Sequence, residues 1–496
     1  PGAEGARVVN HGNITFAEAG LAGLVAPGVE NTGTIVGKLG SVVVAGQDTF
    51  AVDLAGDGLM AFQMDPAQSA TQVVNTGDIK NDGGYILITA GQADALVSSS
   101  VNVGGSVDAS SDSANGGVVE VYGKDITVAA DADVRADGAT GGGTVLIGGD
   151  KRGAGTDNAF FANTLSVERG AELTARATHA GDGGFIETSA REITLAPTVS
   201  TLGAGPDGVT GEWLIDPENV TISNAVTGPG NVNITDLVAQ LALTNVTIET
   251  DGNADPDGFG LPPISGTVGE DGNITVVDTL TILTAGTTLT LDADNAVIIN
   301  AAVNTAGGLS LMAANGAGGV GGLGTGIELN ANVTVDGTFA IDSAGTVDGS
   351  GSVVTTANLL DVDAAGQTVL LNNVGNDFGG QVDVAGQDVT LVDANGITLR
   401  DIDATGALSV TAGGDVTQVA GVIAGDSINV AGATTINAAG FAVTLDDQFN
   451  DFVGAVSAAG TNISLTDANA VTLGDIDDAG NLVLVAGGTV DDGADA

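Results

Sequence analysis

The sequence predicts an all-β protein built as a parallel β-helix, an elongated solenoid rod in which short strands stack coil upon coil. Three observations predict it: a short phrase that recurs near the N-terminus, a glycine-glycine phrase that precedes alternating apolar residues, and a long block that is duplicated near the C-terminus. The composition agrees, because glycine is abundant (79 of 496 residues) and aromatic residues make up only 3%. Small side chains suit a narrow, evenly repeating core.

The first phrase is Val-x-Asn-x-Gly-x-Ile, which occurs as VVNHGNIT (8–15), VENTGTIV (29–36) and VVNTGDIK (73–80). Its asparagines, Asn10, Asn31 and Asn75, are 21 and 44 residues apart. Because 44 is twice 22, the spacing predicts coils of fixed length with two coils in the second interval. Val and Ile predict a short strand. Asn-x-Gly predicts a turn, since both residues tolerate positive φ and Asn can bond its own backbone.

The second phrase is Gly-Gly followed by alternating apolar residues, in GGYILI (83–88), GGVVEV (116–121), GGTVLI (142–147) and GGFIET (183–188). Successive side chains of a strand point to opposite faces, so every second residue should face the core. The intervals of 33, 26 and 41 residues are irregular, which predicts that loops leave the solenoid at some corners. The expected inward positions are Ile86, Ile88, Val119, Val121, Val145, Ile147 and Ile186.

The third observation is the duplication. Residues 376–416 align without gaps on residues 450–490, at an offset of 74 residues and with about half of the positions identical. This offset is too long for one coil, so the block should contain three or four coils that were copied together. At about 21 residues per coil, the whole chain would form roughly 23 coils.

Three regions are expected along the chain. Residues 1–215 form a loop-decorated β-helix, residues 216–270 a seam, and residues 271–496 a repetitive shaft that includes the duplicated block. The seam contains the one helical pattern, ITDLVAQLALTNVTIET (234–250), with Thr235 as the candidate N-cap. The segment 251–266 concentrates Pro, Gly and Asp, so it is expected to be a loop that leaves the solenoid.

The charge of the chain limits its partners. The formal net charge is −51, and Arg400 is the one basic residue after Arg191. Such a surface repels phosphate and anionic lipid, so we expect no nucleic-acid partner and no membrane insertion. No apolar run reaches the length of a membrane-spanning helix. Cysteine is absent, which excludes disulfides and thiol chemistry. Both ends look cut, so targeting segments are expected outside these residues.

Several phrases, in this order, carry a family resemblance: GLVAPGVENTGTI, NGGVVEVYGKDITVAADADVRADG, GGTVLIGGD, GDGGFIETSA and GEWLIDPENVTIS, followed by the NDF…DANAVTLG blocks. Together they resemble filamentous haemagglutinin-type exoproteins of bacterial two-partner secretion. The resemblance implies a right-handed β-helix that is secreted or held at the bacterial cell surface and acts in adhesion and biofilm formation. It also implies an outer-membrane β-barrel transporter as the partner of the precursor, because the segment that the transporter recognises lies upstream of, or overlaps, the first residues here.

Catalytic chemistry has little support in the sequence. His11 and His179 lie far apart and are expected in exposed turns, and no Ser/His/Asp set is present. Aspartates two residues apart project from one face of a strand and could share a proton or a cation. A carbohydrate-cleaving enzyme would surround such acids with aromatic and basic residues, which are scarce here. We therefore expect no enzyme, with a polysaccharide lyase or hydrolase as the weakest alternative. The pairs are Asp131/Asp133, Asp292/Asp294, Asp361/Asp363, Asp401/Asp403 and Asp475/Asp477.

Calcium is the one ion that the residues suggest. Both copies of the block keep the Asp-Ile-Asp sequence, which makes Asp401, Asp403, Asp475 and Asp477 the candidate ligands. The alternative is that these aspartates are solvated corner residues. Trp213 is expected in the core or at a coil cap, and Phe378 and Phe452, at matching positions of the two copies, are expected to fill the core.

The sequence thus predicts a non-catalytic extracellular fibre that mediates adhesion to cells, surfaces or biofilm matrix. Loops in residues 1–270 are the expected contact sites for a glycan or protein receptor. The alternative is a structural subunit that associates with itself into a filament or matrix, because uncapped solenoid ends invite pairing.

Overall fold

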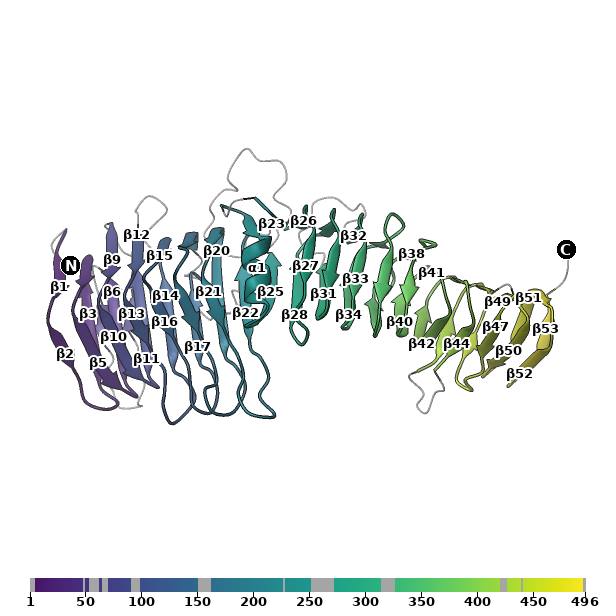
Figure 1. Cartoon of the computed structure of the whole chain (residues 1–496), viewed down its shortest axis with the longest axis horizontal. Helices are drawn as coiled ribbons and strands as arrows, with labels where there is room; N and C mark the ends of the chain where they lie inside the picture. The colour runs from purple at the N-terminus through teal and green to yellow at the C-terminus, as the bar shows by residue number, and fades with distance from the viewer. Residues whose placement is uncertain are drawn as a thin grey trace. The chain divides into compact units, whose positions relative to one another are not determined.

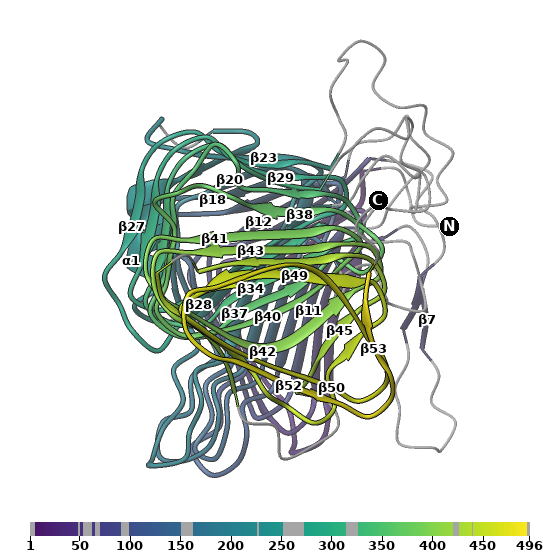
Figure 2. The same cartoon turned by 90° about the vertical axis from the view of Figure 1, so that its right-hand side faces the viewer.

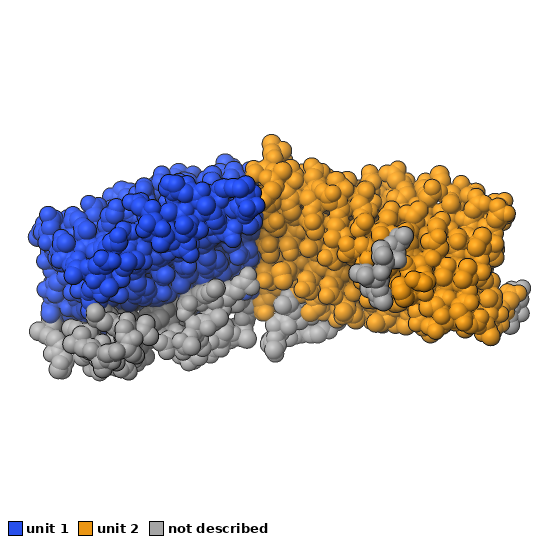
Figure 3. Space-filling view, turned by 90° about the horizontal axis from the view of Figure 1, so that it is seen from below, with its two compact units in different colours: residues 1–270 blue, residues 271–496 orange. Residues whose placement is uncertain are grey.

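The computed structural model describes residues 5–47, 50–52, 62–64, 70–90, 99–149, 162–225, 228–250, 272–313, 326–419, 426–438 and 440–493. The chain divides into two compact units, Pro1–Glu270 and Asp271–Ala496 (Figure 3). In each unit nearly every element is a β-strand, and the described strands of neighbouring coils pair in parallel (Figure 1). The prediction of an all-β parallel β-helix is confirmed. The loop expected at 251–266 lies outside the described residues.

Each complete coil of unit 1 contributes a strand to three parallel sheets, named here A, B and C, which Figure 2 shows with successive coils behind one another. Sheet A contains β1 (Arg7–Asn10), β4 (Gly28–Asn31), β9 (Thr71–Asn75), β12 (Ser99–Val103), β15 (Asp125–Val128), β18 (Ala162–Val167) and the second half of β20 (Phe185–Leu195). Sheet B contains β2 (Asn13–Thr15), β5 (Thr34–Lys38), β10 (Asp78–Asp82), β13 (Ser106–Asp108), β16 (Asp133–Arg135), β19 (Glu172–Thr174) and β21 (Thr198–Ser200). Sheet C contains β3 (Leu21–Ala26), β6 (Ser41–Gly46), β11 (Tyr85–Ala90), β14 (Val118–Tyr122), β17 (Thr144–Ile147), the first half of β20, β22 (Glu212–Asp216) and β25 (Asn245–Thr250).

The asparagines of the first phrase form a buried ladder through three successive coils. Asn10 Nδ2 donates to Asn31 Oδ1 at 2.8 Å, and Asn31 Nδ2 donates to Asn75 Oδ1 at 2.7 Å. Asn75 Nδ2 in turn donates to the carbonyl oxygens of Gly77 and Gly104. Asn31 and Asn75 are fully buried, so the neighbouring coils supply the partners that each amide requires.

The ladder corrects two expectations drawn from this phrase. Asn31 and Asn75 are register partners in β4 and β9, so the 44-residue interval is one coil with a long excursion and not two coils. That excursion includes the antiparallel hairpin of β7 (Phe50–Val52) and β8 (Phe62–Met64). The described residues form eight coils in unit 1 and eleven in unit 2, fewer than the roughly 23 expected from a fixed period.

A positive φ angle does not explain why Asn-x-Gly recurs at these turns, contrary to the expectation from the sequence. Neither the three asparagines nor Gly12, Gly33 and Gly77 have positive φ. The glycines are required by close approach instead: a Cβ on Gly33 would overlap the carbonyl oxygen of Gly12, and one on Gly77 would overlap that of Gly33. The part of the expectation that holds is the local bond, in which the Gly12 N–H donates to Asn10 Oδ1 at 3.0 Å.

The Gly-Gly phrases occupy successive strands of sheet C in register. Ile86 pairs with Val119, Val119 with Val145, and Val145 with Ile186. All seven predicted inward positions are fully buried, as expected. The second glycine of each phrase stacks against its counterpart in the previous coil, so that a Cβ on Gly117, Gly143 or Gly184 would overlap a carbonyl oxygen.

Sheet B ends at a helix. After β23 (Val220–Ser223) and β24 (Asn231–Asn233), α1 (Ile234–Gln240) lies beside β21. Gln240 acts as a substitute for the next strand, because its Oε1 accepts from Val199 N–H at 2.7 Å and its Nε2 donates to Pro197 O at 3.1 Å. The helix predicted in this region is present, but its N-cap is Asn233, one residue before the helix, and not Thr235. Among the described residues, no helix is long and apolar enough to cross a membrane.

Unit 2 begins with three strands per coil and continues with two, in sheets named here D, E and F. Sheet D contains β26 (Ile274–Val276), β29 (Val297–Ile299), β32 (Ile327–Leu329), β35 (Val347–Asp348), β38 (Val369–Leu371), β41 (Val389–Asp393), β43 (Leu408–Ala412), β46 (Thr434–Asn437), β49 (Ala455–Gly460), β51 (Val471–Asp478) and β53 (Val490–Asp492). Sheet E contains β27 (Leu280–Ile282), β30 (Val303–Thr305), β33 (Val333–Val335), β36 (Val354–Thr356) and β39 (Asp377–Phe378). Sheet F contains β28 (Thr288–Ala293), β31 (Gly308–Ala313), β34 (Phe339–Ser343), β37 (Leu360–Asp363), β40 (Gln381–Gly386), β42 (Ile397–Ala404), β44 (Val416–Gln418) with β45 (Ile428–Val430), β47 (Ala442–Leu445) with β48 (Asp451–Phe452), β50 (Asn462–Asp467) and β52 (Leu482–Ala486).

The 74-residue offset of the duplication corresponds to three and a half coils. Strand β41 lies in sheet D, whereas its counterpart β50 lies in sheet F; β42 lies in sheet F, whereas its counterpart β51 lies in sheet D. Counting from β41 to β50, the chain changes sheet seven times. The two copies therefore place equivalent residues in different sheets of the same unit.

Both copies nevertheless rebuild the same internal contacts. Asn376 Oδ1 accepts from Val354 N–H, and Asn450 Oδ1 accepts from Ile428 N–H, 74 residues later in each case. The buried carboxylates of Asp393 and Asp467 accept from the N–H groups of Phe378 and Phe452 at 2.7 and 3.1 Å. Both phenylalanines are buried in the core, which confirms their expected place.

We predict that Asn31→Ala lowers the free energy of unfolding by about 1–3 kcal/mol, because the substitution leaves buried amide groups of Asn10 and Asn75 without partners. Urea denaturation followed by circular dichroism measures the loss. Asn13→Ala, at an exposed position of β2 in sheet B, is the matched control and should change stability little. Equal effects of the two substitutions would contradict the role of the ladder.

Candidate functional site

Four loops of unit 1 leave the coil between sheets B and C and pack on one another. We call residues 109–117, 136–143, 175–184 and 201–211 the loop stack; it projects from the lower edge of unit 1 in Figure 1 and at the lower left in Figure 2. Backbone hydrogen bonds join consecutive loops, from Ser111 N to Asp137 O, from Gly138 N to Arg176 O and from Ala177 N to Leu202 O, at 2.8–2.9 Å. The lengths of the four loops differ by at most three residues, so the loop stack does not account for the irregular intervals between the Gly-Gly phrases. Residues 91–98 and 150–161, which fall within the two longer intervals, lie outside the described residues.

An ion pair stabilises the middle of the loop stack. Arg176 contacts the carboxylate of Asp137 through Nη2 at 2.8 Å, and the Arg176 backbone N–H donates to the same carboxylate at 2.7 Å. Asp137 is buried, with 7% of its surface exposed, so this pair gains more than a fully solvated one. The outer ends of the loops carry exposed polar residues, including Asp112, Asn115 and His179. The stack is thus an ordered surface with a polar rim.

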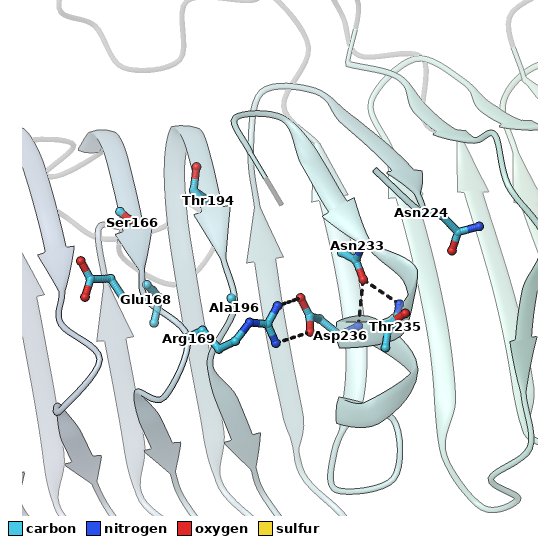
Figure 4. Close-up of a pocket in the computed structure, with 10 residues that line it drawn as sticks. Ser166, Glu168, Arg169, Thr194, Ala196, Asn224, Asn233, Thr235 and Asp236 are labelled. Atoms are coloured by element: carbon cyan, nitrogen blue, oxygen red, sulfur yellow. Dashed lines mark hydrogen bonds and ion pairs between the residues drawn. The ribbon is translucent and has the colours of Figure 1, made fainter. Parts of the chain in front are cut away.

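A groove of about 510 Å³, lined mostly by residues of polar type, lies on unit 1 between sheet A and the start of α1 (Figure 4). Its lining includes Ser166 and Thr194, which are register partners in β18 and β20. Arg169, in the turn after β18, reaches Asp236 of α1 with two hydrogen bonds at 2.9 and 2.8 Å. Asn233 also lines the groove, while its Oδ1 caps the helix.

The lining of the groove supplies groups that can form hydrogen bonds with a ligand. It does not place a nucleophilic side chain next to a side chain that could act as its base. Arg169 contacts both carboxylate oxygens of Asp236, which leaves that carboxylate poorly placed to act as a base. Ser166 and Thr194 contribute hydroxyl groups, and Glu168 a carboxylate. No motif in the sequence indicated this site, because its lining comes from three separate stretches of the chain, 166–169, 194–196 and 224–236.

The paired aspartates fall at outward positions of strands or corners. Asp361 and Asp363 flank the buried Val362, and Asp401 and Asp403 flank the buried Ile402, as expected for residues two apart in a strand. Asp131 and Asp133 flank the buried Ala132, and Asp292 and Asp294 flank the buried Ala293. Asp133 is engaged in an ion pair with Arg135 at 2.5 Å.

The aspartates of sheet F also stack across coils. We call Asp342, Asp361, Asp363, Asp383, Asp401 and Asp403 the carboxylate column. Within it Asp342 is the register partner of Asp363, and Asp361 is the register partner of Asp383. Neighbouring strands are about 4.8 Å apart, so these charges repel one another across the coils.

Arg400 relieves part of this repulsion. Its Nη2 donates to Asp383 Oδ2, and its Nε lies 4.0 Å from Asp426 Oδ1. Arg400 and Asp401 of β42 lie opposite the single residue Asp383 of β40. This pairing of two residues with one is a β-bulge. In the second copy the same bulge opposes Ser457, and Gly474 replaces the arginine. The ion pair of one copy therefore corresponds to an uncharged pair in the other.

The column shifts the titration of its members. Burial raises the pKa of Asp342, and the charge of Asp363 raises it further. Burial raises the pKa of Asp383, although Arg400 opposes the shift. Burial also raises the pKa of Asp401, with an added contribution from Asp403.

The four candidate calcium ligands do not converge. Asp401 and Asp403 lie in β42 of sheet F, and Asp475 and Asp477 lie in β51 of sheet D. Within the ranges that the structure describes, no group of three or more His, Asp or Glu side chains is placed to hold a metal ion. Calcium binding by either pair stays a prediction.

The remaining single residues occupy structural positions. Trp213 is buried, and its Nε1–H donates to Thr188 Oγ1 at 3.0 Å, which confirms its expected place in the core. His11 and His179 are exposed in turns, as expected. His11 Nδ1 lies 2.6 Å from Thr32 Oγ1, so the histidine takes part in the stacking of neighbouring turns.

Comparison with known families places only part of the chain. Residues 317–385 and 386–459 each match a family described as repeats of unknown function (DUF5649). The second match is 74 residues long, the same as the offset of the duplication. None of the curated proteins matches the chain.

We predict that Arg400→Gly lowers the free energy of unfolding by roughly 1–3 kcal/mol, since it leaves the largely buried Asp383 without its cation. Adding Asp383→Ser should restore most of the loss, because Ser457 Oγ accepts from Asp475 N–H at 3.1 Å as Asp383 Oδ1 accepts from Asp401 N–H at 3.3 Å. Urea denaturation of the single and double variants measures the coupling. A double variant less stable than Arg400→Gly alone would contradict this account.

We also predict that unit 2 is more stable in mildly acidic than in neutral solution. The folded-state pKa values of Asp342, Asp383 and Asp401 lie above the ordinary value of 3.8. The folded unit therefore binds more protons than the unfolded chain just above that pH, and its stability falls as the pH rises through the raised pKa values.

Urea midpoints of the full chain at a series of pH values measure this dependence. Asp342→Asn should reduce it, because one titrating group of the column is removed without a large change in shape. A midpoint that rises from mild acid to neutrality would contradict the prediction.

Proposed function

We propose that this chain is part of an extracellular, non-catalytic β-solenoid fibre at the bacterial surface, and that it mediates adhesion through the loop stack of unit 1. The observation that carries the proposal is that four loops from consecutive coils are joined by backbone hydrogen bonds into one ordered lateral surface. A pre-organised surface loses little conformational entropy when it binds a partner.

The scaffold supports this role. Parallel pairing between coils holds the loops at the strand spacing, so a receptor would meet several loops at once. Exposed polar residues at the loop ends suit hydrogen bonding to a surface glycan or protein. The net charge of −51 keeps chains soluble and apart, as a secreted fibre requires.

The groove beside α1 is a second place where a ligand could bind on the same unit. It is open, and its arginine and carboxylates are already engaged or exposed. In the adhesion proposal it is an accessory contact, and the loop stack is the primary one.

Binding assays with rim variants test the proposal. The variant Asp112→Ala/Asn115→Ala/His179→Ala removes exposed side chains of the loop stack, while Gln72→Ala/Glu192→Ala/Thr198→Ala removes as many exposed side chains from strands of sheets A and B. We predict that the loop-stack variant loses most binding to epithelial cells, a glycan array or a biofilm matrix, and that the strand variant retains it. Circular dichroism confirms folding of both.

Three other outcomes would overturn the proposal. Equal binding by both variants and the unmodified protein would exclude the loop stack as the contact surface. Long periodic fibres formed by the purified chain in electron micrographs, without binding to any of these surfaces, would favour a structural subunit instead. Cleavage of polysaccharides by the purified chain would favour an enzyme.

A further inference from the structure

The two copies of the duplicated block differ by one methyl group at an exposed corner. Between β41 and β42 the chain reads Asp-Ala-Asn-Gly, ending in Asn395–Gly396. At the equivalent corner, between β50 and β51, it reads Asp-Ala-Asn-Ala, ending in Asn469–Ala470. Both asparagines are exposed to solvent.

The two corners share the bond to the preceding aspartate, but the carbonyl oxygen of Asn469 also accepts from the Gly488 N–H at 2.6 Å, a bond that has no counterpart at Asn395 among the described residues. The Asn395 N–H donates to Asp393 Oδ1 at 2.7 Å, and the Asn469 N–H donates to Asp467 Oδ1 at 2.6 Å. The N–H groups of Gly396 and Ala470 donate no hydrogen bond to any residue that the structure describes. Each asparagine is thus followed by a backbone nitrogen that is free to react.

We propose that Asn395 is a site of spontaneous deamidation, and that Asn469 is protected by the side chain of the residue after it. The backbone nitrogen of Gly396 attacks the side-chain Cγ of Asn395 and loses its proton to solvent. A C–N bond forms, the side-chain nitrogen leaves as ammonia, and a five-membered succinimide results. Water then opens the ring to aspartate or isoaspartate, so the net reaction consumes one water and releases one ammonia.

Glycine favours this reaction because it has no Cβ to crowd the ring or to restrict the backbone that must bend towards Cγ. Ala470 places a methyl group at this position. Asparagine is among the thermally labile residues. At this exposed corner, the absence of a side chain on Gly396 favours formation of the succinimide.

A second Asn-Gly pair in the chain lies in a different environment. In the loop stack, the Gly116 N–H donates to Gly141 O at 3.0 Å, and Asn115 Oδ1 accepts from Thr140 Oγ1 at 2.7 Å. Both reacting groups are therefore held by hydrogen bonds. The pair Asn315–Gly316 lies outside the described residues.

The product would alter unit 2 locally. Aspartate at position 395 adds a negative charge beside the buried carboxylate of Asp393, whose pKa is already raised by burial and by Asp377. Isoaspartate lengthens the main chain by one methylene between β41 and β42, two strands whose neighbours are fixed in register. We expect the modification to destabilise this coil. The modified fraction of Asn395 would increase with the age of the protein.

The test is peptide mass spectrometry on the full chain after incubation in mildly alkaline buffer. We expect Asn395 to deamidate several-fold faster than Asn469 and Asn115, with isoaspartate as the larger product. The exchange variant Gly396→Ala/Ala470→Gly should move the fast site from Asn395 to Asn469.

The comparison within the unmodified protein keeps the proposal falsifiable if the exchange variant does not fold. Equal rates at Asn395 and Asn469 in the unmodified protein would overturn it, as would a fast site that stays at Asn395 after the exchange. Faster reaction at Asn115 than at Asn395 would show that free N–H groups and exposure do not govern the rate.

Discussion

The structure depends on one constraint, that successive coils approach to strand-pairing distance at their corners as well as along their strands. Neighbouring strands lie about 4.8 Å apart, which leaves no room for a side chain where two corners stack. The columns of Gly12, Gly33 and Gly77, and of Gly117, Gly143 and Gly184, meet this requirement, because a Cβ on the later members would overlap a carbonyl oxygen. The abundance of glycine thus follows from backbone contact between coils.

The same constraint governs polar groups. A polar side chain that points inward at a corner is repeated at the strand spacing, so it must bond to its own copies. Asn10, Asn31 and Asn75 do so as a ladder of amides, each of which both donates and accepts. Carboxylates cannot form such a ladder. When aspartates stack in sheet F they repel, and Arg400 relieves part of this repulsion by pairing with Asp383. The equivalent of Asp383 in the second copy, which lies in sheet D, is the uncharged Ser457.

The repeating unit of the sequence differs from that of the structure. A 74-residue offset spans three and a half coils, so equivalent strands fall in different sheets, while the internal contacts of Asn376 and Asn450 are rebuilt unchanged. This is possible because both sheets face one shared core, and a buried phenylalanine or asparagine needs the same surroundings in either sheet. Outward residues have different neighbours in the two sheets. Asp401 and Asp403 therefore lie on sheet F, and their counterparts Asp475 and Asp477 lie on sheet D.

The sequence by itself determined the fold class, the inward positions and the core places of Trp213, Phe378 and Phe452, because alternation and repetition are local properties that any stacked coil must satisfy. Only the tertiary structure decided that 44 residues make one coil, that Asn233 caps α1, and that Arg169 meets Asp236 across a groove. Those outcomes depend on which distant segments pair. A gap of 44 residues fits one coil with an excursion as well as two plain coils, and the choice is made by the register of β4 against β9.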